Sequence, residues 1–436
     1  MGNTAGNRSE VFFSGERTLV ARSGSIQLSL EILMKERLDE LEQWGADVIF
    51  GRAKGFRASL ARGLMLGLSG VFRVLVQLRI GLYRCGWKPQ QYIGAQVVSI
   101  GNISVGGTGK TPVVELLARS LRDRGRKVAI LSRGYKSKRL GYAQKWHRAD
   151  GRLVPSEFMP KIVSTGSALL LDSKFAGDEP FMLAKNLDGV AVIVDKDRVK
   201  AARFAITELE TETLLLDDGM QYLDLAHSFD IVLVDSTSPF GTGSLLPRGT
   251  LREPPKNLRR ASHILITKCD GSSNADLISR IRKYNPVADI IECAHGPIHL
   301  ENLYTRQRES LEFLKDKWVG AISAIAVPEG FENSLSKLGA KVEIKRRFSD
   351  HHRFNRRDID DFTQRCVERD MDIIVTTEKD AVRFPRPTEI NVPIYFLRIE
   401  VRILSGQAAW DEMVDLLCTP PPVMDSVLKT VGEYRV

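Results

Sequence analysis

The sequence predicts an α/β protein that begins with a doubly wound parallel sheet and continues into a smaller C-terminal α/β domain. Two observations predict this fold. Short apolar runs alternate with helical stretches, and a second series of the same kind follows a polar interruption. The composition agrees, because 43% hydrophobic and 27% charged residues are typical of a folded globular protein. It excludes wholesale disorder, a collagen-like chain and a polytopic membrane protein.

The first series begins after Pro89 with a predicted strand, Gln96–Ile100, and a predicted helix, Pro112–Arg124. Short buried strands that alternate with helices favour a parallel sheet covered on both faces. A further helix is predicted at Val199–Glu210, and the other strands of this series at Val128–Leu131, Ala191–Val194, Thr213–Leu216, Ile231–Val234 and Ile264–Thr267.

A second series follows Ile290–Leu303, which alternates polar and apolar residues and is predicted to form a connecting ribbon. Its predicted elements are Trp318–Ala326, Phe331–Leu338, Lys341–Lys345, Asp358–Glu368, Asp372–Thr376, Pro393–Arg398 and Ala408–Leu417. At ~150 residues per domain, 436 residues suggest two or three domains.

Charge and cysteine content limit the partners. Sixty-three basic against 54 acidic residues give a net charge of +9, which fits an anionic partner such as phosphate, nucleic acid or an acidic lipid surface. The five cysteines are far apart and form no CxxC pair, so we expect neither a zinc site nor a disulfide framework. A reducing compartment follows from this.

The N-terminal region contains an extension and then an apolar helix. The first residues show no signal-peptide pattern, and Ile26–Trp44 has the spacing of an amphipathic helix. From Phe56 to Trp87 the chain is rich in Leu, Val and Phe, but its longest uncharged run, Gly63–Phe72, is shorter than the ~20 residues of a spanning helix. We therefore expect a helix that lies in a membrane interface, and the alternative is a helix that spans the membrane.

Arginines in this helix recur every 11 residues, at Arg62, Arg73 and Arg84, and would share one face. Such a stripe suits anionic lipid headgroups. The alternative is a helix packed on the protein surface with snorkelling arginines.

The strongest motif is GNISVGGTGKT, residues 101–111, which follows a predicted strand and opens a helix. This is the context of a phosphate-binding loop (P-loop), in which glycine N–H groups and the helix dipole face an anion. Lys110 would reach the β- and γ-phosphates, and the Thr111 hydroxyl would ligate Mg²⁺. Ser104 replaces the usual first glycine. The predicted nucleotide-binding residues are Gly106, Gly107, Thr108, Gly109, Lys110 and Thr111.

Two acidic motifs accompany this loop. Asp217 and Asp218 end an apolar strand, where one carboxylate can hold a metal ion directly or through water, or Asp218 can simply form a turn with Gly219. In GDEP, Asp178 is predicted to cap a helix with Pro180 in its first turn. The functional alternative is that Asp178 takes the proton from a substrate hydroxyl.

Two further motifs remain open from the residues alone. Asp350-His-His352 holds tandem histidines that point to different faces, so at most one enters a given site, and surface histidines are the alternative. No other His or Cys stands near at metal-ligand spacing. The basic loop Leu246–Pro254 could clamp phosphate or merely connect two elements.

Together and in this order, these motifs resemble the tetraacyldisaccharide 4′-kinases. The resemblance covers most of Gln96 to Phe384 and depends on SIGNISVGGTGKTP, ILSRGY, GDEPFMLA, DKDRVKAA, LLLDDGMQ, DIVLVD, LLPRGTLREPP, FSDHHRF and TTEKDAVRF. It implies a P-loop NTPase-like kinase that uses ATP and Mg²⁺ to phosphorylate the 4′-hydroxyl of a tetraacylated glucosamine disaccharide 1-phosphate in lipid A biosynthesis. It also implies a peripheral position at the cytoplasmic face of the inner membrane, and we expect neither a nucleic acid nor an obligate protein partner.

The resemblance further implies a division of the chain and roles for single residues. Asp178 would act as the base, with His351, or else His352, tuning it. Lys110 and Thr111 would serve phosphate and metal, Asp217 and Asp218 the metal region, and the cleft would be lined by Glu179, Arg198, Arg252 and Glu253. The implied parts are an extension (1–55), a membrane-associated helix (56–90), a kinase domain (91–289), a β linker (290–304), a C-terminal domain (305–420) and a tail (421–436).

Two features run against this resemblance. The family's DDGFQH is DDGMQY here, with Met220 and Tyr222, which removes any role of that histidine. Thr267–Asp270 (TKCD) resembles the guanine-reading element of GTPases. A P-loop GTPase or a metallochaperone-like nucleotide switch is therefore the alternative function.

Overall fold

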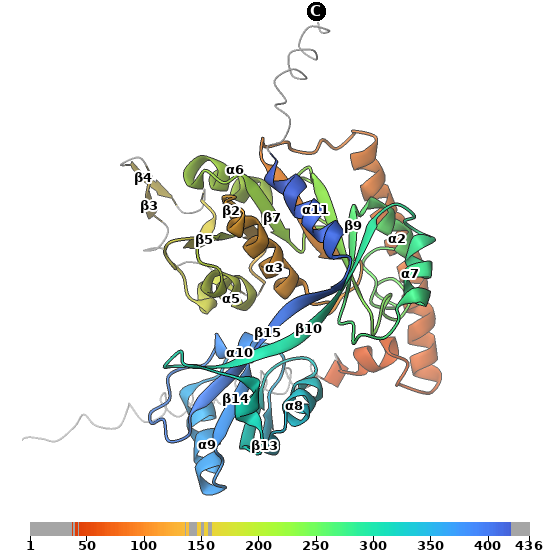
Figure 1. Ribbon diagram of the computed structural model, residues 1–436. Helices are drawn as coiled ribbons and strands as arrows, with labels where there is room; N and C mark the ends of the chain where they lie inside the picture. Colours follow the sequence, from red (N-terminus) through yellow and green to blue (C-terminus); the bar gives the residue numbers. More distant parts are fainter. Residues whose placement is uncertain are drawn as a thin grey trace, which may run out of the picture. The chain divides into compact units, whose positions relative to one another are not determined.

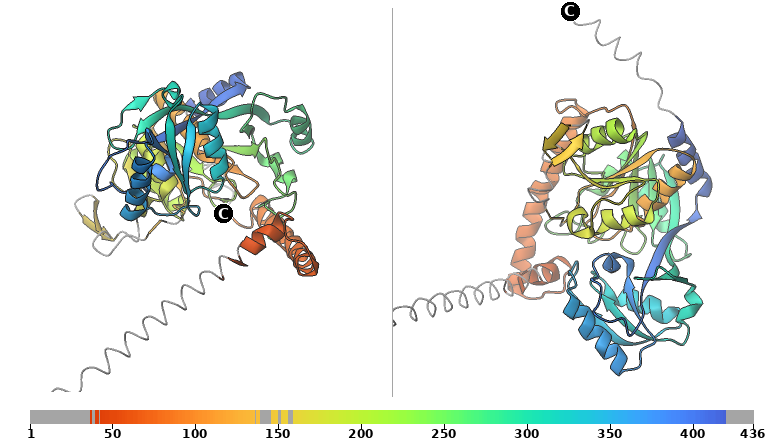
Figure 2. Two further views of the ribbon diagram at one scale, coloured as in Figure 1. Left: turned by 90° about the horizontal axis from the view of Figure 1, so that it is seen from below. Right: turned by 90° about the vertical axis from the view of Figure 1, so that its left-hand side faces the viewer.

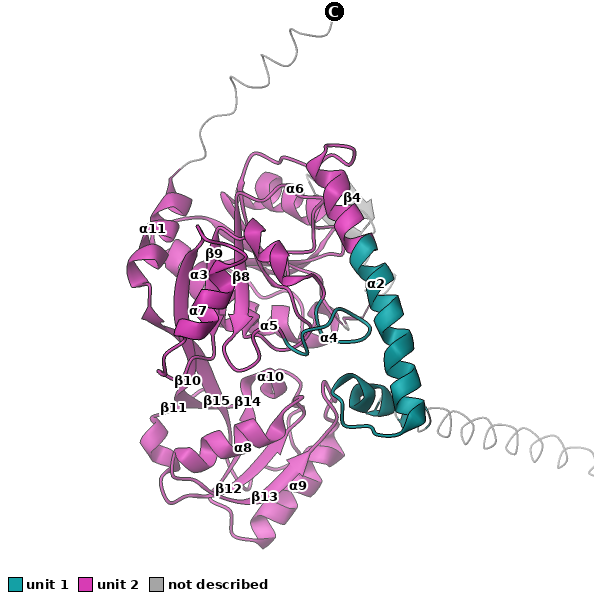
Figure 3. Cartoon of the chain, turned by 90° about the vertical axis from the view of Figure 1, so that its right-hand side faces the viewer, with its two compact units in different colours: residues 1–74, 241–251 teal, residues 75–240, 252–436 magenta. Residues whose placement is uncertain are grey.

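The structure is a computed structural model, and it describes residues 37, 40–41, 43–135, 137–138, 146–149, 152–155 and 159–419. Most of the predicted helix Ile26–Trp44 and the predicted tail lie outside these residues. The chain divides into two units, residues 1–74 with 241–251 and residues 75–240 with 252–436, which are coloured separately in Figure 3.

The larger unit holds one sheet with the strand order β13-β12-β14-β15-β10-β9-β8-β1-β7-β2-β6-β5, with β11 paired to β10. Two α/β halves share this sheet through a long antiparallel ribbon of β10 (Asp289–Asn302) and β15 (Ile394–Ser405), which runs from one half to the other (Figures 1 and 2). The predicted α/β fold with a doubly wound parallel sheet is confirmed.

In the first half, the strands from β9 to β6 are parallel, and β5 is an antiparallel edge strand. The strands are β1 (Gln96–Asn102), β2 (Val128–Ser132), β5 (Lys161–Thr165), β6 (Ala191–Val194), β7 (Thr213–Asp217), β8 (Phe229–Asp235) and β9 (His263–Thr267). The helices are α3 (Lys110–Asp123), α4 (Ser173–Ala176), α5 (Asp178–Asn186), α6 (Arg198–Leu209) and α7 (Ala275–Arg282), with a 3₁₀ turn η2 (Pro255–Arg260) and a separate hairpin of β3 (Trp146–Ala149) and β4 (Arg152–Pro155).

Both faces of this half are covered, because successive residues of each strand enter different cores. Val98 packs with α3, α5 and the final helix α11 (Gln407–Cys418), whereas its neighbour Val97 packs with the α6 side. Fully buried parallel strands are expected to be apolar on both faces. The carboxyl ends of these strands therefore form one edge, at which a ligand site is expected.

The second half contains parallel strands β12 (Trp318–Ser323), β13 (Lys341–Arg347) and β14 (Ile373–Thr377), and β14 pairs in parallel with β15. Its other elements are α8 (Pro328–Lys337), α9 (Arg356–Glu368), α10 (Glu378–Ala381), β11 (Arg308–Glu309) and the 3₁₀ turn η3 (Leu311–Leu314). The prediction for Pro393–Arg398 was too short, because β15 continues to Ser405 as the second arm of the ribbon.

Helix α2 (Phe56–Arg84) begins in the smaller unit and ends in the larger one. By length and hydropathy alone it could cross a membrane, with a mean hydropathy of 1.5 over 18 residues of which 6% are buried. Within the smaller unit, the Ser69 hydroxyl donates to the Leu245 carbonyl (2.8 Å) and accepts from the Arg248 N–H (3.0 Å), so the loop 241–251 is attached to this helix. The exposed large apolar side chains of α2 are Phe56, Leu60, Leu64, Leu66, Leu68, Val71, Val74, Leu75 and Leu78.

Candidate active site

The glycine loop joins β1 to α3 and has the local geometry that its sequence predicts. Gly109 precedes the first helical residue with φ 78°, and a Cβ there would lie 2.3 Å from Nε2 of His295, so only glycine fits. The Lys110 ammonium donates to Asn102 Oδ1 (3.3 Å) and lies 3.4 Å from Asp218 Oδ1. The lysine is thus held by the last residue of β1 and by the residue that follows β7.

Asp217 lies beside this loop because β1 and β7 are parallel neighbours, with Ile100 opposite Asp217. Its carboxylate is buried and accepts a hydrogen bond from Ser132 Oγ (3.2 Å). Burial, together with the Glu179 carboxylate, raises the pKa of Asp217 to about 7 against the opposing effect of Lys110. The charge of Lys110 therefore does not offset the burial of this carboxyl.

Asp218, the next residue, has the opposite electrostatics. Arg252 donates to both of its oxygens, at 2.9 and 2.7 Å. Burial alone would raise the pKa of Asp218, but Lys110 and Arg252 lower it below its usual value. Its φ of 57° places it in a turn with Gly219, as the structural alternative predicted. Arg252 belongs to the larger unit, whereas most of the predicted clamp loop belongs to the smaller one.

Asp178 and His351 lie together although 173 residues separate them. Asp178 Oδ2 is 3.1 Å from His351 Nδ1. The predicted capping role of Asp178 is wrong, because the helix begins at Asp178 itself after Gly177 (φ 96°), and no side-chain capping bond is formed there among the described residues. His352 points elsewhere and lies 2.9 Å from Asp358 Oδ2. Of the two histidines, His351 is the one that the structure brings to Asp178.

Three cations surround this pair, and no role was predicted for any of them. Arg353 lies 3.6 Å from Asp178 Oδ1, and Nε of Arg383 lies 3.6 Å from Oδ2. The Lys379 ammonium is 3.4 Å from His351 Nε2. Lys379 and Arg383 belong to the motif TTEKDAVRF, whose charges were the available signal. Asp178 is thus a largely buried carboxylate in a basic environment.

Arg383 also fixes the loop that bears the histidines. Its fully buried guanidinium donates to the carbonyls of His352 (2.9 Å) and Ala324 (3.3 Å), and it pairs with Asp380. The N–H of His351 donates to the same Ala324 carbonyl at 3.1 Å. This arrangement holds His351 at φ 65°, a conformation that non-glycine residues seldom adopt.

Glu253 and Glu179, two other residues predicted to line the cleft, have different surroundings. Glu253 is buried and accepts hydrogen bonds from Arg260 (2.8 Å), Asn257 (2.7 Å) and Gln221 (3.0 Å). Because these partners occupy both of its oxygens, Glu253 stabilises the turn that carries Arg252. Glu179, in contrast, lies 3.7 Å from the Lys379 ammonium.

Arg198 is buried at the start of α6, and its guanidinium lies 5.0 Å from the Tyr222 ring centre. Burial lowers its pKa, although Asp217 and Asp218 are close enough to raise it. The Tyr222 hydroxyl accepts from the Arg198 N–H at 3.0 Å. Tyr222 therefore supports Arg198 in this chain, where the resembling family has a histidine.

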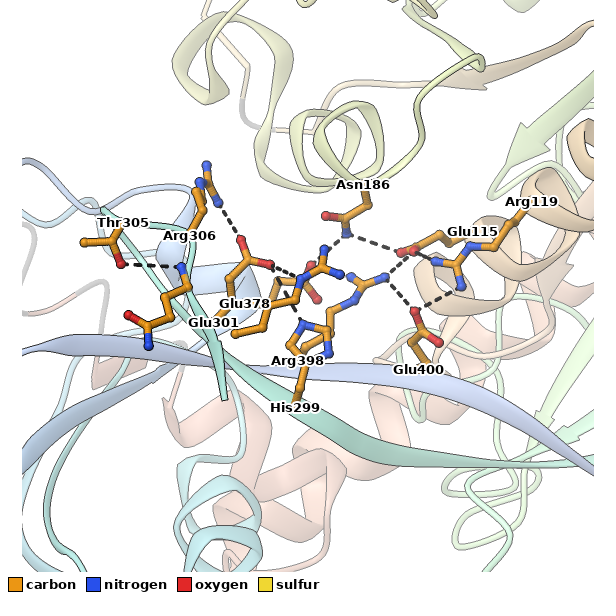
Figure 4. A network of polar contacts seen from close by, with 12 residues as sticks. Glu115, Arg119, Asn186, His299, Glu301, Thr305, Arg306, Glu378, Arg398 and Glu400 are labelled. Atoms are coloured by element: carbon orange, nitrogen blue, oxygen red, sulfur yellow. Dashed lines mark hydrogen bonds and ion pairs between the residues drawn. The ribbon is translucent and has the colours of Figure 1, made fainter. Parts of the chain in front are cut away.

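A network of buried ion pairs connects the two halves (Figure 4). Arg398 on the ribbon pairs with Glu115 on α3 and with Glu378, the first residue of α10. Asn186, at the end of α5, donates to Glu378 (2.7 Å) and to Glu115 (3.3 Å). The network thus joins the helix that follows the glycine loop to the helix that carries Lys379.

The guanine-reading resemblance of Thr267–Asp270 has a structural explanation. Thr267 Oγ1 donates to the Thr108 carbonyl at 2.8 Å and so supports the glycine loop from behind. Lys268 pairs with Asp235 (2.5 Å). Asp270 accepts from both the backbone N–H and the hydroxyl of Ser272, at 2.9 and 2.5 Å.

Fold and site together define an α/β protein with a phosphate-binding type of loop at the carboxyl edge of its sheet and a carboxylate–histidine pair drawn from two halves. The model of the family Tetraacyldisaccharide-1-P 4'-kinase matches residues 61–418. The chain therefore belongs to the tetraacyldisaccharide 4′-kinase family, as its motifs predicted.

Named relatives and a solved structure agree. A "Tetraacyldisaccharide 4'-kinase" of Anaeromyxobacter dehalogenans (strain 2CP-C) is 40% identical over 342 residues, which are 78% of this chain and 86% of the relative. The protein of the same name from Halothermothrix orenii is 34% identical, over 77% of this chain and 88% of its own. The crystal structure of "apo" form LpxK from Aquifex aeolicus in complex with ATP matches with a TM-score of 0.64 and 27% identity, over 82% of this chain and 100% of that one.

Proposed function

We propose that this protein transfers the γ-phosphate of ATP to the 4′-hydroxyl of a tetraacylated glucosamine disaccharide 1-phosphate. Membership of the kinase family supports this reaction and argues against the GTPase or metallochaperone alternative. The observation that carries the proposal is the 3.1 Å contact between Asp178 and His351. It supplies a base in the same sheet-edge site as the glycine loop.

Phosphoryl transfer depends on positioning and on neutralising charge. Backbone N–H groups of the glycine loop and Lys110 would hold the β- and γ-phosphates of ATP. Lys110 is already oriented by Asn102 and Asp218, so little reorganisation is needed when the nucleotide binds. Arg252, fixed on Asp218, places a further positive charge beside the transferring group.

Asp178 would accept the proton of the 4′-hydroxyl as that oxygen attacks the γ-phosphorus. Its Oδ1 atom has the Arg353 guanidinium at 3.6 Å but no hydrogen-bond partner among the described residues, so it can still accept a hydrogen bond from a substrate donor. Arg353 and Arg383 place positive charge 3.6 Å from each oxygen of this carboxylate. His351 orients the carboxylate through its contact with Oδ2, so that Oδ1 faces the proton to be accepted.

The residues beside the loop fit Mg²⁺. The Asp217 carboxylate forms no ion pair within the described part of the chain, and its pKa is raised to about 7 despite the charge of Lys110. Thr111 stands in the first turn of α3. No group of three or more acidic, His or Cys side chains in the described part of the chain forms a metal cluster, as expected when one or two carboxylates and the phosphates hold Mg²⁺. Asp217 and Thr111 would hold the ion, with Asp218 in the second sphere, and it would neutralise phosphate charge.

The two halves would have separate tasks. We assign nucleotide binding to residues 91–289 and the assisting histidine to residues 305–420, joined at residues 290–304. Since the base and the histidine come from different halves, the catalytic pair exists only when these halves are closed. The ribbon β10–β15 and the ion-pair network behind it are the elements that would set this closure.

The exposed apolar side chains of α2 support attachment to the inner membrane from the cytoplasmic side. The acyl chains of the proposed acceptor would stay in the bilayer while the sugar enters the site. The residues 56–90 would then bring the enzyme to its substrate, with neither nucleic acid nor a second protein required.

A transfer assay tests the proposal. Purified full-length protein is incubated with γ-labelled ATP, Mg²⁺ and the tetraacylated disaccharide 1-phosphate, with GTP and a 4′-deoxy acceptor as matched controls. We expect label at the 4′-position with ATP, and none on the 4′-deoxy acceptor. Hydrolysis of GTP without any transfer to the acceptor would refute the kinase proposal.

A further inference from the structure

A polar pocket lies at the edge of the sheet opposite to the candidate active site. It has a volume of about 300 Å³, and its polar lining includes Arg84 on α2, Arg260 on η2 and His227 just before β8. Because β8 runs parallel to β1 and β7, the start of β8 lies at the edge remote from the glycine loop. A seven-residue strand separates these edges by about 20 Å, so the pocket is distinct from the nucleotide site.

Two buried nitrogen atoms of this pocket have no hydrogen-bond partner among the described residues. The His227 side chain is 5% exposed, and its Nδ1 is paired with Asp230 at 3.0 Å, whereas its Nε2 is buried without a partner among the described residues. Nε of Arg260 is likewise buried without a hydrogen-bond partner among the described residues. Unpartnered buried polar atoms are costly, so their presence beside a cavity indicates a ligand that completes them.

The charge of the pocket indicates the kind of ligand. Arg84 forms no ion pair within the described part of the chain, and burial together with the cations Arg259 and Arg260 lowers its pKa. The Asp230 carboxylate at the pocket is already paired with His227. Arg260 is already paired with Glu253, so the unpaired positive charge at the pocket is that of Arg84, which Arg259 and Arg260 repel. An anion that accepts several hydrogen bonds, above all a phosphate group, would offset this repulsion.

The surroundings of the pocket indicate where such a phosphate would come from. Arg84 is the last residue of the apolar helix α2, and Trp87 and Tyr92 just beyond it are 83% and 72% exposed. Exposed Trp and Tyr at the end of an apolar helix are typical of the headgroup level of a membrane.

We propose that the pocket formed by Arg84, His227 and Arg260 binds the phosphate of an anionic phospholipid headgroup. This inference rests on the proposed attachment of α2 to a membrane and not on the proposed phosphoryl transfer. The site would fix the depth and rotation of the enzyme on the bilayer, which a helix held only by apolar contacts leaves open.

Titration of the full-length protein with soluble dihexanoyl phosphatidylglycerol tests the site. We expect saturable binding with one lipid per chain, weakened about tenfold by Arg84→Gln, because a charge-assisted hydrogen bond is lost. His227→Asn, which retains a donor toward Asp230 but removes Nε2, should also weaken binding. Arg79→Gln on the same helix is the matched control, since Arg79 does not line the pocket, and should change the affinity less than twofold.

Three further arms separate the alternatives. Dihexanoyl phosphatidylcholine should bind more weakly than phosphatidylglycerol, and inorganic phosphate should compete only at much higher concentration. Inorganic phosphate that binds as tightly as the lipid would overturn the lipid assignment. If Arg84→Gln and Arg79→Gln lost lipid affinity equally and His227→Asn kept it, the lipid would be attracted by overall charge and not bound at this pocket. Kinase activity on a detergent-dispersed acceptor should stay unchanged in all three variants, so loss of lipid binding and failure of the proposed kinase function are distinguishable.

Discussion

The glycine loop and the Asp178–His351 pair are built in different ways. The loop is a contiguous stretch between β1 and α3, and the residues beside and behind it, Asp217 and Thr267, end β7 and β9 of the same half. The pair joins the start of α5 to a loop of the other half. The first region can therefore form whenever its half folds, whereas the second also requires a particular position of the two halves.

The comparison suggests that ATP binding and catalysis can be separated in this protein. Changes to the pair should leave nucleotide affinity intact, because no described contact joins Asp178 or His351 to the glycine loop. Changes near Asp217 should act on the metal and nucleotide first. The predictions below test this separation.

The largest effect is expected for Asp178→Asn. The amide is nearly isosteric but cannot take the proton of the acceptor hydroxyl, so kcat should fall by about 10²–10⁴-fold. The dissociation constant of ATP, measured by calorimetry, should change less than twofold. Asp188→Asn, an exposed position just after α5, is the control and should retain normal turnover. Near-normal turnover of Asp178→Asn would remove the carboxylate from the mechanism.

A smaller effect should distinguish the two neighbouring histidines. His351→Ala removes the group that orients Asp178, and a misplaced base can cost up to about 10²-fold in kcat. His352→Ala loses its contact with Asp358, which should lower thermal stability by about 1 kcal/mol and leave kcat within threefold. Steady-state kinetics and thermal unfolding of both variants provide the comparison. The reverse ranking in kcat would assign the assisting role to His352.

The glycine loop could be predicted from sequence because its physics is local. Glycines before a Lys-Thr pair at a strand–helix junction specify a cradle by themselves. The motif around Asp178 carried no such local signal. Taken alone it predicted a helix cap, and only the resemblance indicated a base. The contact with His351 depends on the ribbon. The second arm of the ribbon, β15, was predicted too short, because charged residues interrupt the apolar run from Arg398 onward.

The residues that the sequence did not reveal are charged ones whose roles arise from tertiary contacts. Arg383 gives no sign in the sequence that it is fully buried between Asp178 and the histidine loop. Arg398 and Glu115 are 283 positions apart, yet form one buried pair. Glu253, in contrast, was predicted to line the cleft, and only its three hydrogen-bond partners indicate that it supports Arg252 instead. Sequence patterns place strands and loops well, but not the partners of long charged side chains.

The smallest expected effect is a pH dependence of stability and of Mg²⁺ binding, which should distinguish Asp217 from Asp218. Burial raises the pKa of Asp217 to about 7, whereas Lys110 and Arg252 lower the pKa of Asp218, so only Asp217 should titrate near neutral pH. A carboxyl whose pKa rises on folding binds its proton more tightly in the folded state. The protein without metal should therefore lose stability as pH increases from about 4, the unfolded pKa, toward 7.

Mg²⁺ requires the ionised carboxylate, so binding of Mg²⁺ and ATP should release nearly one proton at about pH 6 and almost none at about pH 8. The affinity should fall up to about tenfold per pH unit below 7. Calorimetry in buffers of different ionisation enthalpy measures the released protons. Asp217→Asn should remove the protein's share of this release and flatten the pH dependence of stability, whereas Asp218→Asn should preserve that share. The protons that ATP itself releases with Mg²⁺ are measured without protein and subtracted. If Asp218→Asn removed the proton release and Asp217→Asn did not, the metal would belong to Asp218, and the contrast between the two acids would be wrong.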